Sequence, residues 1–234
     1  MSTDDPGRRG ILSLEPDVAA PRFRTRFYMA SGMEKRQQGA IDEAVGHLRQ
    51  GGVVAFPTDT LFGLGADVFS LQALAKVFSI KGRPEKMPLP VLVSGWEQVQ
   101  MVARPESPLP RRLVRRYWPG PLTLVLNRQP GLPDLITAGG DTVAVRMPFH
   151  PVPIALAEGL GSPITGTSAN RSGGEDIRDL ETLETELGHK VDYLVTWGPL
   201  PAGVASTVVD LTSDEPRLLR PGALDFEDVL AACR

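Results

Sequence analysis

An apolar run that stops at a proline and is followed at once by a polar turn constrains the fold of this chain most strongly. The run 53–56 (Val-Val-Ala-Phe) ends at Pro57, and Thr58, Asp59 and Thr60 form the turn. A helical segment and a short cationic loop come next. In an open α/β sheet, ligands bind beyond the carboxyl ends of the strands. The order of segments therefore predicts that the hydroxyls of the turn and the cations of the loop meet at one sheet edge.

The rest of the chain continues this alternation of strands and helices. Apolar spacing predicts helices at 38–50, 71–80, 94–102, 108–117, 151–159, 180–187 and 225–232. Short apolar or alternating runs predict strands at 53–56, 89–93, 122–126, 142–146, 162–167, 191–195, 207–211 and 216–220, with a loop at 127–140. Alternating strands and helices are typical of an α/β domain.

The first 36 residues differ from the rest of the chain. They mix charge, proline and glycine without a clear period, so we expect residues 1–36 to form a flexible tail. Residues 37–234 are expected to form one domain. The chain has 234 residues, of which 41% are hydrophobic, and this is enough for a complete core.

Charge and cysteine content exclude several classes of protein. A net charge of −3 gives no global attraction to nucleic acid or to a membrane. No apolar run approaches the roughly 20 residues of a membrane helix. Cys233 is the single cysteine, so no intrachain disulfide can form, and no signal peptide is recognisable. We therefore expect a cytoplasmic protein. The histidines are scattered, and no cysteine–histidine spacing suggests zinc.

The loop after the helix at 71–80 is a candidate phosphate clamp. Lys81 offers a compact charge and Arg83 a planar fork of donors, and phosphate sites commonly use both. The alternative is a solvated cationic helix end, which the spacing alone favours because cations stabilise helix C-termini.

Small polar residues and cations follow other strands in the same way. Thr58 and Thr60 could bind a ligand or satisfy a local turn, and the segment 167–170 (Thr-Ser-Ala-Asn) could bind a ribose, phosphate or metal or be an ordinary loop. Arg146 ends a strand and could pair with a substrate carboxylate. Ser206 and Arg220 repeat the pattern. Five such places in one chain are less easily accidental than one.

Four arginines on one helix suggest a second anion site. Arg111, Arg112, Arg115 and Arg116 lie on about one side of the predicted helix and could bind a polyanion such as RNA. The alternative is a solvated face. Neither a P-loop nor a dinucleotide fingerprint is present, so any ATP site must use another scheme.

Taken together, these segments resemble the YrdC-type threonylcarbamoyl-AMP synthases, in the short form with a single domain. The matching pieces occur in the family's order: PTDTLFGLG (57–65), KGRP with PLPVLV (81–93), WPGPLTLVL (118–126), TVAVRMPFHP (142–151), TSANRSG (167–173), STVVDL (206–211) and LRPG (219–222). This chain departs from the usual pattern at Met87, Leu92, Asp176 and Ala205.

The resemblance implies a fold and a reaction. The fold would be an α/β structure with a twisted, open, mixed sheet, flanking helices and a large central cavity. The enzyme would be a nucleotidyltransferase that makes threonylcarbamoyl-AMP and pyrophosphate from L-threonine, bicarbonate or CO2, and ATP with Mg²⁺. A partner transferase complex would then modify an adenosine of tRNA.

The resemblance also assigns roles to individual residues, although it leaves the metal ligands unknown. The catalytic set would be Lys81, Arg83, Ser168 and Asn170. The ATP-binding set would be these four with Thr142 and Arg220. The threonine-binding set would be Thr58, Thr60, Arg146 and Ser206.

Two other functions remain open at this stage. The first is a tRNA- or double-stranded-RNA-binding protein of the same fold without chemistry, which would bind RNA with steep salt dependence and release no pyrophosphate. The second is a carbamoyltransferase similar to the related domain of hydrogenase-maturation proteins. Those proteins carry zinc-finger and acylphosphatase parts that this chain lacks.

Overall fold

The computed structural model describes residues 35–82 and 86–234. Arg83 lies outside the described residues, as does nearly all of the predicted tail. The helices are α2 (Lys35–Arg49), α3 (Leu71–Lys81), α4 (Trp96–Val102), α5 (Leu109–Tyr117), α6 (Asp134–Thr137), α7 (Pro151–Leu160), α8 (Leu180–Leu187) and α9 (Phe226–Cys233). The strands are β1 (Val54–Phe56), β2 (Gly63–Gly65), β3 (Val91–Leu92), β4 (Leu122–Asn127), β5 (Thr142–Arg146), β6 (Ile164–Thr165), β7 (Thr167–Ser168), β8 (Tyr193–Leu194), β9 (Thr207–Asp210) and β10 (Arg217–Arg220).

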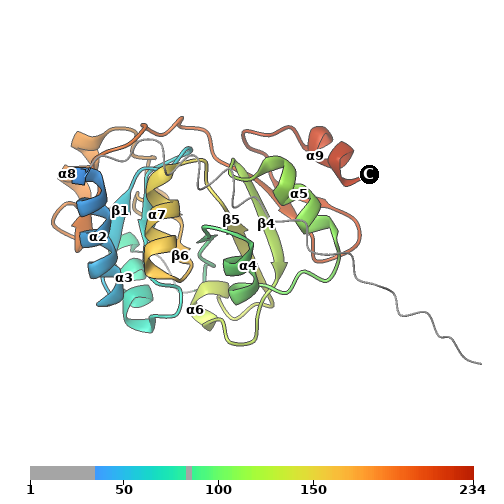
Figure 1. Ribbon diagram of the computed structural model, residues 1–234, viewed down its shortest axis with the longest axis horizontal. Coiled ribbons are helices and arrows are strands. Elements are labelled where there is room, and N and C mark those ends of the chain that lie inside the picture. Colours follow the sequence, from blue (N-terminus) through green and yellow to red (C-terminus); the bar gives the residue numbers. More distant parts are fainter. Residues whose placement is uncertain (1–34, 83–85) are drawn as a thin grey trace, which may run out of the picture.

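The strands form two mixed sheets with helices packed around them (Figure 1). One sheet has the order β7-β2-β1-β8 and the other the order β10-β9-β4-β5-β3-β6. The pairs β1/β8, β3/β5 and β4/β9 are parallel and the remaining pairs are antiparallel. The predicted α/β class with a mixed sheet and flanking helices is confirmed, with its strands divided between two sheets.

A short connection links the two sheets. β6 is the last strand of the larger sheet and β7 the first of the smaller one, and a single residue separates them in the chain. On one side Leu92 of β3 pairs with Arg146 of β5, and on the other Gly63 of β2 pairs with Ser168 of β7. The connection therefore brings the ends of β5, β2 and β7 into one neighbourhood.

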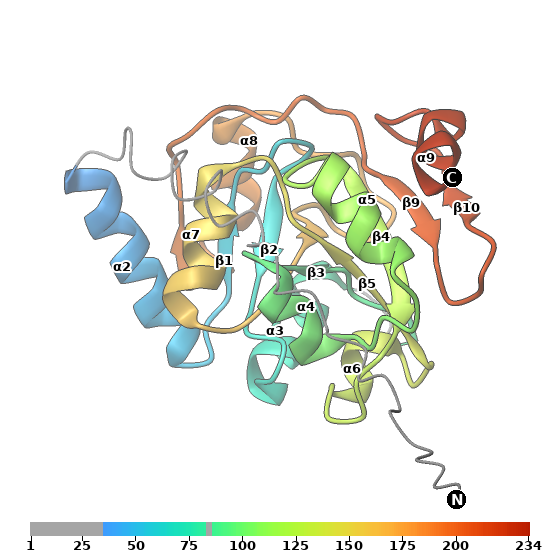
Figure 2. The ribbon, with the colours of Figure 1, turned by 45° about the vertical axis from the view of Figure 1, so that its right-hand side comes forward.

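The buried apolar side chains form two clusters, and each cluster includes residues from strands of both sheets. The larger cluster of buried side chains fills the space around the six-stranded sheet and under α3, α4, α5 and α8. The smaller cluster lies between β1 and the helices α2 and α7, which pack against each other. In Figure 2 these two helices cover one side of β1, whereas α5 and α9 lie over the other end of the molecule. No helix within the described ranges is long and apolar enough to cross a membrane.

Two elements were missing from the sequence-based expectation. β2 occupies the Gly-x-Gly segment, and α6 lies in the region expected to be a loop. Glycine is depleted in strands, which hides β2 from a propensity argument. Here the glycines allow close packing, because a Cβ built on Gly65 would lie 2.5 Å from Cε1 of Phe56. Glycine is therefore needed in β2 because the Phe56 ring approaches closely, even though glycine has a low strand propensity.

The ends of α3 set the position of Lys81. Ser70 is the N-cap, and its side chain accepts a hydrogen bond from the N–H of Ala73, as is usual for serine at this position. Gly82 is the C-cap with φ 55°, a left-handed conformation that glycine adopts without steric cost. The helix therefore ends at Lys81.

Candidate active site

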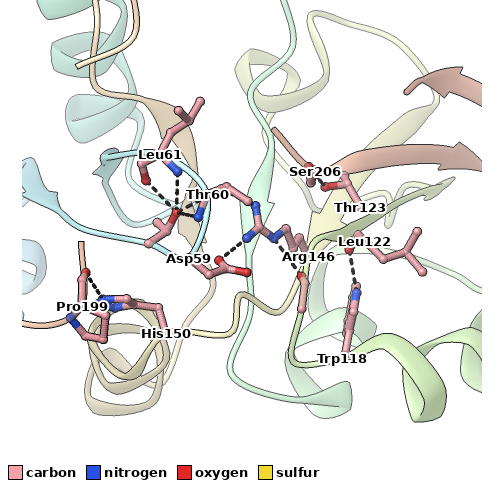
Figure 3. A network of polar contacts seen from close by, with 12 residues as sticks. Asp59, Thr60, Leu61, Trp118, Leu122, Thr123, Arg146, His150, Pro199 and Ser206 are labelled. Atoms are coloured by element: carbon pink, nitrogen blue, oxygen red, sulfur yellow. Dashed lines mark hydrogen bonds and ion pairs between the residues drawn. The ribbon is translucent and has the colours of Figure 1, made fainter. Parts of the chain in front are cut away.

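Arg146 is the centre of a buried polar network at the end of β5 (Figure 3). Its side chain comes from the larger sheet and is only 8% exposed. Nε donates to the carbonyl of Gly120 at 3.0 Å, and Nη1 donates to Oγ1 of Thr60 at 2.8 Å. Nη2 forms a close ion pair with Oδ1 of Asp59. The guanidinium of Arg146, on β5 of the larger sheet, is therefore held by the polar turn that follows β1 of the smaller sheet.

Burial and charge act on this guanidinium in opposite directions. Burial lowers the pKa of Arg146, the Asp59 carboxylate raises that pKa, and the nearby charge of Arg220 lowers it further. Arginine nevertheless stays protonated in proteins. The site therefore contains a permanent, mostly desolvated positive charge whose direct counter-ion is Asp59.

The turn at 58–61 both satisfies its own backbone and directs a hydroxyl at Arg146. Oγ1 of Thr58 accepts from the N–H groups of Thr60 and Leu61 at 3.1 and 3.2 Å, and donates to the carbonyl of Leu61 at 2.6 Å. A hydroxyl has a single donor, so Thr60 must donate in the 3.1 Å contact between the two hydroxyls. The lone pairs of Thr60 are then directed at Arg146.

Ser206 and Arg220 form a second polar group beside the network. Nη2 of Arg220 donates to the backbone carbonyl of Ser206 at 2.9 Å and to its hydroxyl at 3.1 Å. Oγ of Ser206 lies 2.8 Å from Oγ1 of Thr123. The charge of Arg220 also contributes to the lowering of the Arg146 pKa.

Lys81, Ser168 and Asn170 form a third group. Lys81 is only 2% exposed, and its Nζ donates to the backbone carbonyls of Ser168 and Asn170, the latter at 2.7 Å. Oγ of Ser168 donates to Oδ1 of Asn170 at 2.6 Å, and Nδ2 of Asn170 donates to the carbonyl of Gly174 at 2.6 Å. The lysine is therefore the anchor of the 168–174 loop.

The same turn links these groups. Gly63 pairs with Ser168, and the N–H of Ala169 donates to the carbonyl of Phe62 at 2.8 Å. The 168–170 segment therefore lies against the residues that directly follow Thr60. Arg83 lies outside the described residues, so its place relative to Lys81 stays a prediction.

Thr142, a predicted ATP-binding residue, lies at the opposite end of β5 from Arg146. It is exposed at the start of β5 and pairs with Asn127, whereas Arg146 ends the strand. An extended strand rises by roughly 3.3 Å per residue, so these two positions are roughly 13 Å apart. Of the residues that depart from the family pattern, Met87 is exposed and Leu92 is buried.

A pocket of about 470 Å³ lies beside the network. Asp59, Thr60 and Gly120, which are the three partners of Arg146, all line it. Phe149 and Val204 are exposed apolar residues of the same lining. The pocket can therefore hold a small ligand with one polar and one apolar side. The large central cavity expected from the resemblance stays a prediction.

Sequence reasoning placed Asp59 in the polar turn without giving its carboxylate a role, and it did not identify His150 as part of this region. The only signal for Asp59 was its position between two threonines. His150 caps α7: its Nδ1 accepts from the N–H of Val152 at 3.2 Å, and its Nε2 lies 3.1 Å from the carbonyl of Pro199. Nε2 therefore carries the proton in the neutral ring.

His150 holds the connection between β8 and β9, which runs across the top of the molecule in Figure 2. This connection contributes Ala202 and Val204 to the pocket. It is also bonded to the turn, because the N–H groups of Ala202 and Gly203 donate to the carbonyls of Asp59 and Thr60 at 3.2 and 2.9 Å. His150 thus supports one wall of the pocket.

The stability of this wall should depend on pH. Burial lowers the pKa of His150, although the Pro199 carbonyl and the Asp59 carboxylate oppose the shift. Below about pH 6.5 the unfolded chain therefore binds a proton that the folded chain rejects. We expect the midpoint of thermal unfolding to fall as the pH is lowered from about 7.5 to about 5.5.

Two variants isolate the contribution of His150. Asparagine caps helices well and does not titrate, so His150→Asn should flatten the pH dependence over this range. His189→Asn removes an exposed histidine and should leave the dependence unchanged. Equal slopes in all three proteins would contradict this account of His150.

Three of the four arginines of α5 line a separate groove. Arg111, Arg112 and Arg115 line a depression of about 570 Å³ together with Trp96 of α4. The guanidinium of Arg111 stacks over the Trp96 ring at 5.6 Å, whereas Arg116 stacks over Tyr117. Arg112 donates to the carbonyl of Cys233 at 2.7 Å, so part of its role is to hold α9. RNA binding by these four arginines stays a prediction.

These features define a class of protein: an α/β fold of two linked mixed sheets that holds the buried cations Arg146 and Lys81 against small hydroxyls and loop carbonyls. The model of the Sua5/YciO/YrdC family, whose description reads "Telomere recombination", matches residues 46–222. The chain belongs to this family, and the predicted resemblance is confirmed.

Named relatives agree with this membership. The chain is 40% identical over 196 residues to the threonylcarbamoyl-AMP synthase of Pyrococcus abyssi, covering 84% of this chain and 58% of the relative. It is 37% identical over 161 residues to the synthase of Coxiella burnetii, covering 69% of this chain and 86% of the relative. The chain thus spans somewhat more than half the length of the P. abyssi protein.

A solved structure matches the fold. The crystal structure of P. abyssi Sua5 complexed with L-threonine superimposes with a TM-score of 0.80 at 39% identity, covering 86% of this chain and 58% of that one.

Proposed function

We propose that this chain is a threonylcarbamoyl-AMP synthase that makes threonylcarbamoyl-AMP and pyrophosphate from L-threonine, bicarbonate or CO2, and ATP. The observation that carries the proposal is the buried guanidinium of Arg146, which the Thr60 hydroxyl and the Asp59 carboxylate hold at the wall of a small pocket. The names of the relatives support the same activity, and the P. abyssi complex shows a family member with L-threonine bound.

The threonine end of the proposed site is the Arg146 network. The guanidinium has N–H donors beyond the three bonds described above. A carboxylate that accepts from a buried guanidinium makes a charge-assisted bond, the strong kind in a low-dielectric setting. Thr58, Thr60 and Ser206 supply hydroxyls for the polar side chain of threonine, and the apolar lining of the pocket suits its methyl group.

The ATP end is the group around Lys81. In the proposed enzyme Lys81, Arg83, Ser168 and Asn170 neutralise and orient the phosphates, and Thr142 and Arg220 contact the rest of the nucleotide. Lys81 also holds the carbonyls of the 168–170 segment in place. Phosphoryl-type transfer depends mainly on positioning and charge stabilisation. A preformed loop anchored by a buried lysine meets that requirement.

The proposed reaction has two steps. The threonine ammonium loses a proton to solvent, and the neutral amine attacks the carbon of CO2. The N–C bond forms as one C=O π pair moves onto oxygen, and a second proton leaves the nitrogen to solvent, which gives the carbamate with its negative charge on oxygen. This oxygen attacks the α-phosphorus of ATP, and the bond between the α-phosphorus and the bridging oxygen breaks. Pyrophosphate leaves with that electron pair. The protein supplies orientation and charge neutralisation and forms no covalent intermediate in this scheme.

Magnesium is proposed to enter with ATP. Within residues 35–82 and 86–234 there is no group of three or more His, Cys, Asp or Glu side chains that could hold a metal ion. Mg²⁺ is commonly bound by phosphate oxygens and water with little help from protein ligands. The residues that the structure describes do not form a cage for the ion, and no step above depends on one.

The product implies a partner. Threonylcarbamoyl-AMP is an activated acyl donor, and we propose that a transferase complex in the cytoplasm passes its threonylcarbamoyl group to tRNA.

The test is threonine-dependent release of pyrophosphate. Purified protein with ATP, Mg²⁺ and bicarbonate should release pyrophosphate when L-threonine is added and much less with each other amino acid. Release that does not depend on the amino acid would contradict the proposal. Absent release, together with RNA binding that weakens steeply with salt, would favour a non-catalytic RNA-binding protein.

A further inference from the structure

The wall of the pocket presents a carboxylate that pairs with a guanidinium behind it. Asp59, Thr60 and Gly120 line the pocket, and Arg146 lies behind them and is bonded to all three. The side chains of Asp59 and Arg146 are 14% and 8% exposed. A ligand in this pocket therefore meets the largely desolvated Asp59 carboxylate, and the guanidinium that pairs with this carboxylate lies directly behind the lining.

A contribution to folding stability is not a sufficient reason for burying the Asp59–Arg146 ion pair. Desolvation of two charges offsets much of their attraction, so a buried ion pair is weak grounds for a stabilising role. Asp59 also keeps unused capacity. Its Oδ1 binds Arg146, whereas no residue within the described ranges donates to Oδ2. An ionised carboxylate accepts on both oxygens, so Asp59 can accept a further donor from a ligand.

The neighbouring side chains of His150 and Thr60 do not supply a donor for the second oxygen of Asp59, so we expect it to come from a ligand. Burial lowers the pKa of the nearby His150, and its Nε2–H is already given to the carbonyl of Pro199. The Thr60 hydroxyl donates to Thr58. A cationic donor with several N–H groups would fit the open oxygen best, because charge-assisted bonds are the strong ones.

We propose that Asp59 binds the α-ammonium group of the amino-acid substrate while Arg146 binds its carboxylate. This inference rests on the proposed function and adds to it the group that selects an amino acid over other small acids. The adjacent opposite charges match a zwitterion, whose ammonium and carboxylate are separated by one carbon. An acid without the amine would gain nothing from Asp59 and would meet its negative charge.

Binding of matched ligands to matched variants tests the proposal. Isothermal calorimetry would compare L-threonine with (R)-3-hydroxybutyrate, which keeps the carboxylate, hydroxyl and methyl group but lacks the amine. The wild-type protein should bind threonine at least about 10-fold more tightly. In Asp59→Asn, threonine should weaken by about 10- to 100-fold, and 3-hydroxybutyrate should bind no more weakly than before.

The alternatives give different results. If Asp59 only orients Arg146, both ligands weaken by the same factor in Asp59→Asn. If Asp59 blocks the guanidinium and must be displaced, threonine binds more tightly to the variant. Either result overturns the proposal. Asp134→Asn is the matched control, since Asp134 also pairs with an arginine, at 2.7 Å from Arg128, but is 77% exposed and does not line the pocket.

The wild-type measurement decides the matter if Asp59→Asn does not fold. Equal wild-type affinity for the two ligands would overturn the role of Asp59 and leave threonine as a substrate. Failure of the wild-type protein to bind threonine at all would instead contradict the proposed function, and this inference with it.

Discussion

Replacement of Arg146 by methionine is expected to lower the free energy of unfolding by about 3–5 kcal/mol, because it leaves the Asp59 carboxylate buried without its counter-ion. The carbonyl of Gly120 and the hydroxyl of Thr60 lose their donors at the same time. Affinity for threonine should also fall, by about 10- to 100-fold, if the guanidinium binds the substrate carboxylate. Urea unfolding measures the first effect and calorimetric titration the second.

A double variant separates these two effects. Asp59→Asn combined with Arg146→Met removes both charges, so much of the lost stability should return while threonine affinity stays low. Arg217→Met is the control for loss of an ion pair with aspartate. Arg217 is 74% exposed, so the change should cost less than about 1 kcal/mol. An Arg146→Met protein as stable as the wild type would show that the buried network does not hold this region together.

The second large effect is expected for Lys81→Met. Methionine has a similar length but no donor, so the backbone carbonyls of Ser168 and Asn170 would lose a buried partner. Each unsatisfied buried carbonyl costs about 1–3 kcal/mol, and we expect a total loss of about 2–4 kcal/mol after relaxation. Because the loop would no longer be fixed, ATP-dependent turnover should fall by at least about 100-fold.

Lys76→Met is the matched control for that change. Lys76 lies on the same helix and pairs with Asp192 at 3.3 Å, but its side chain is 40% exposed. Its loss should cost less than about 1 kcal/mol and leave turnover unchanged. If the two lysine variants behave alike, Lys81 is not the anchor of the 168–174 loop.

Local sequence signals predicted most of the fold. Helix periodicity located α3, α5 and α8 within one or two residues. β2 was missed because its glycines are poor strand formers and are there to let the Phe56 ring approach. The two-sheet arrangement was missed because it depends on strand pairings between distant parts of the chain.

The site could be predicted only in part, for the same reason. The family resemblance grouped Thr60 with Arg146, and they are hydrogen-bonded across 86 positions of sequence. No periodicity could show that Asp59 would be the counter-ion of Arg146, or that His150 would hold the connection between β8 and β9. Lys81 was expected at a phosphate on grounds of charge, whereas its bonds to the 168–170 backbone appear only in the structure.

The most direct measurement is the identity of the product. The protein would be incubated with ATP, Mg²⁺, L-threonine and ¹³C-labelled bicarbonate, and the nucleotides would be examined at once by mass spectrometry. The account predicts an adenylate that contains threonine, AMP and a single labelled carbon, formed together with one equivalent of pyrophosphate. A nucleotide product without the label, or with the label but without threonine, would contradict it.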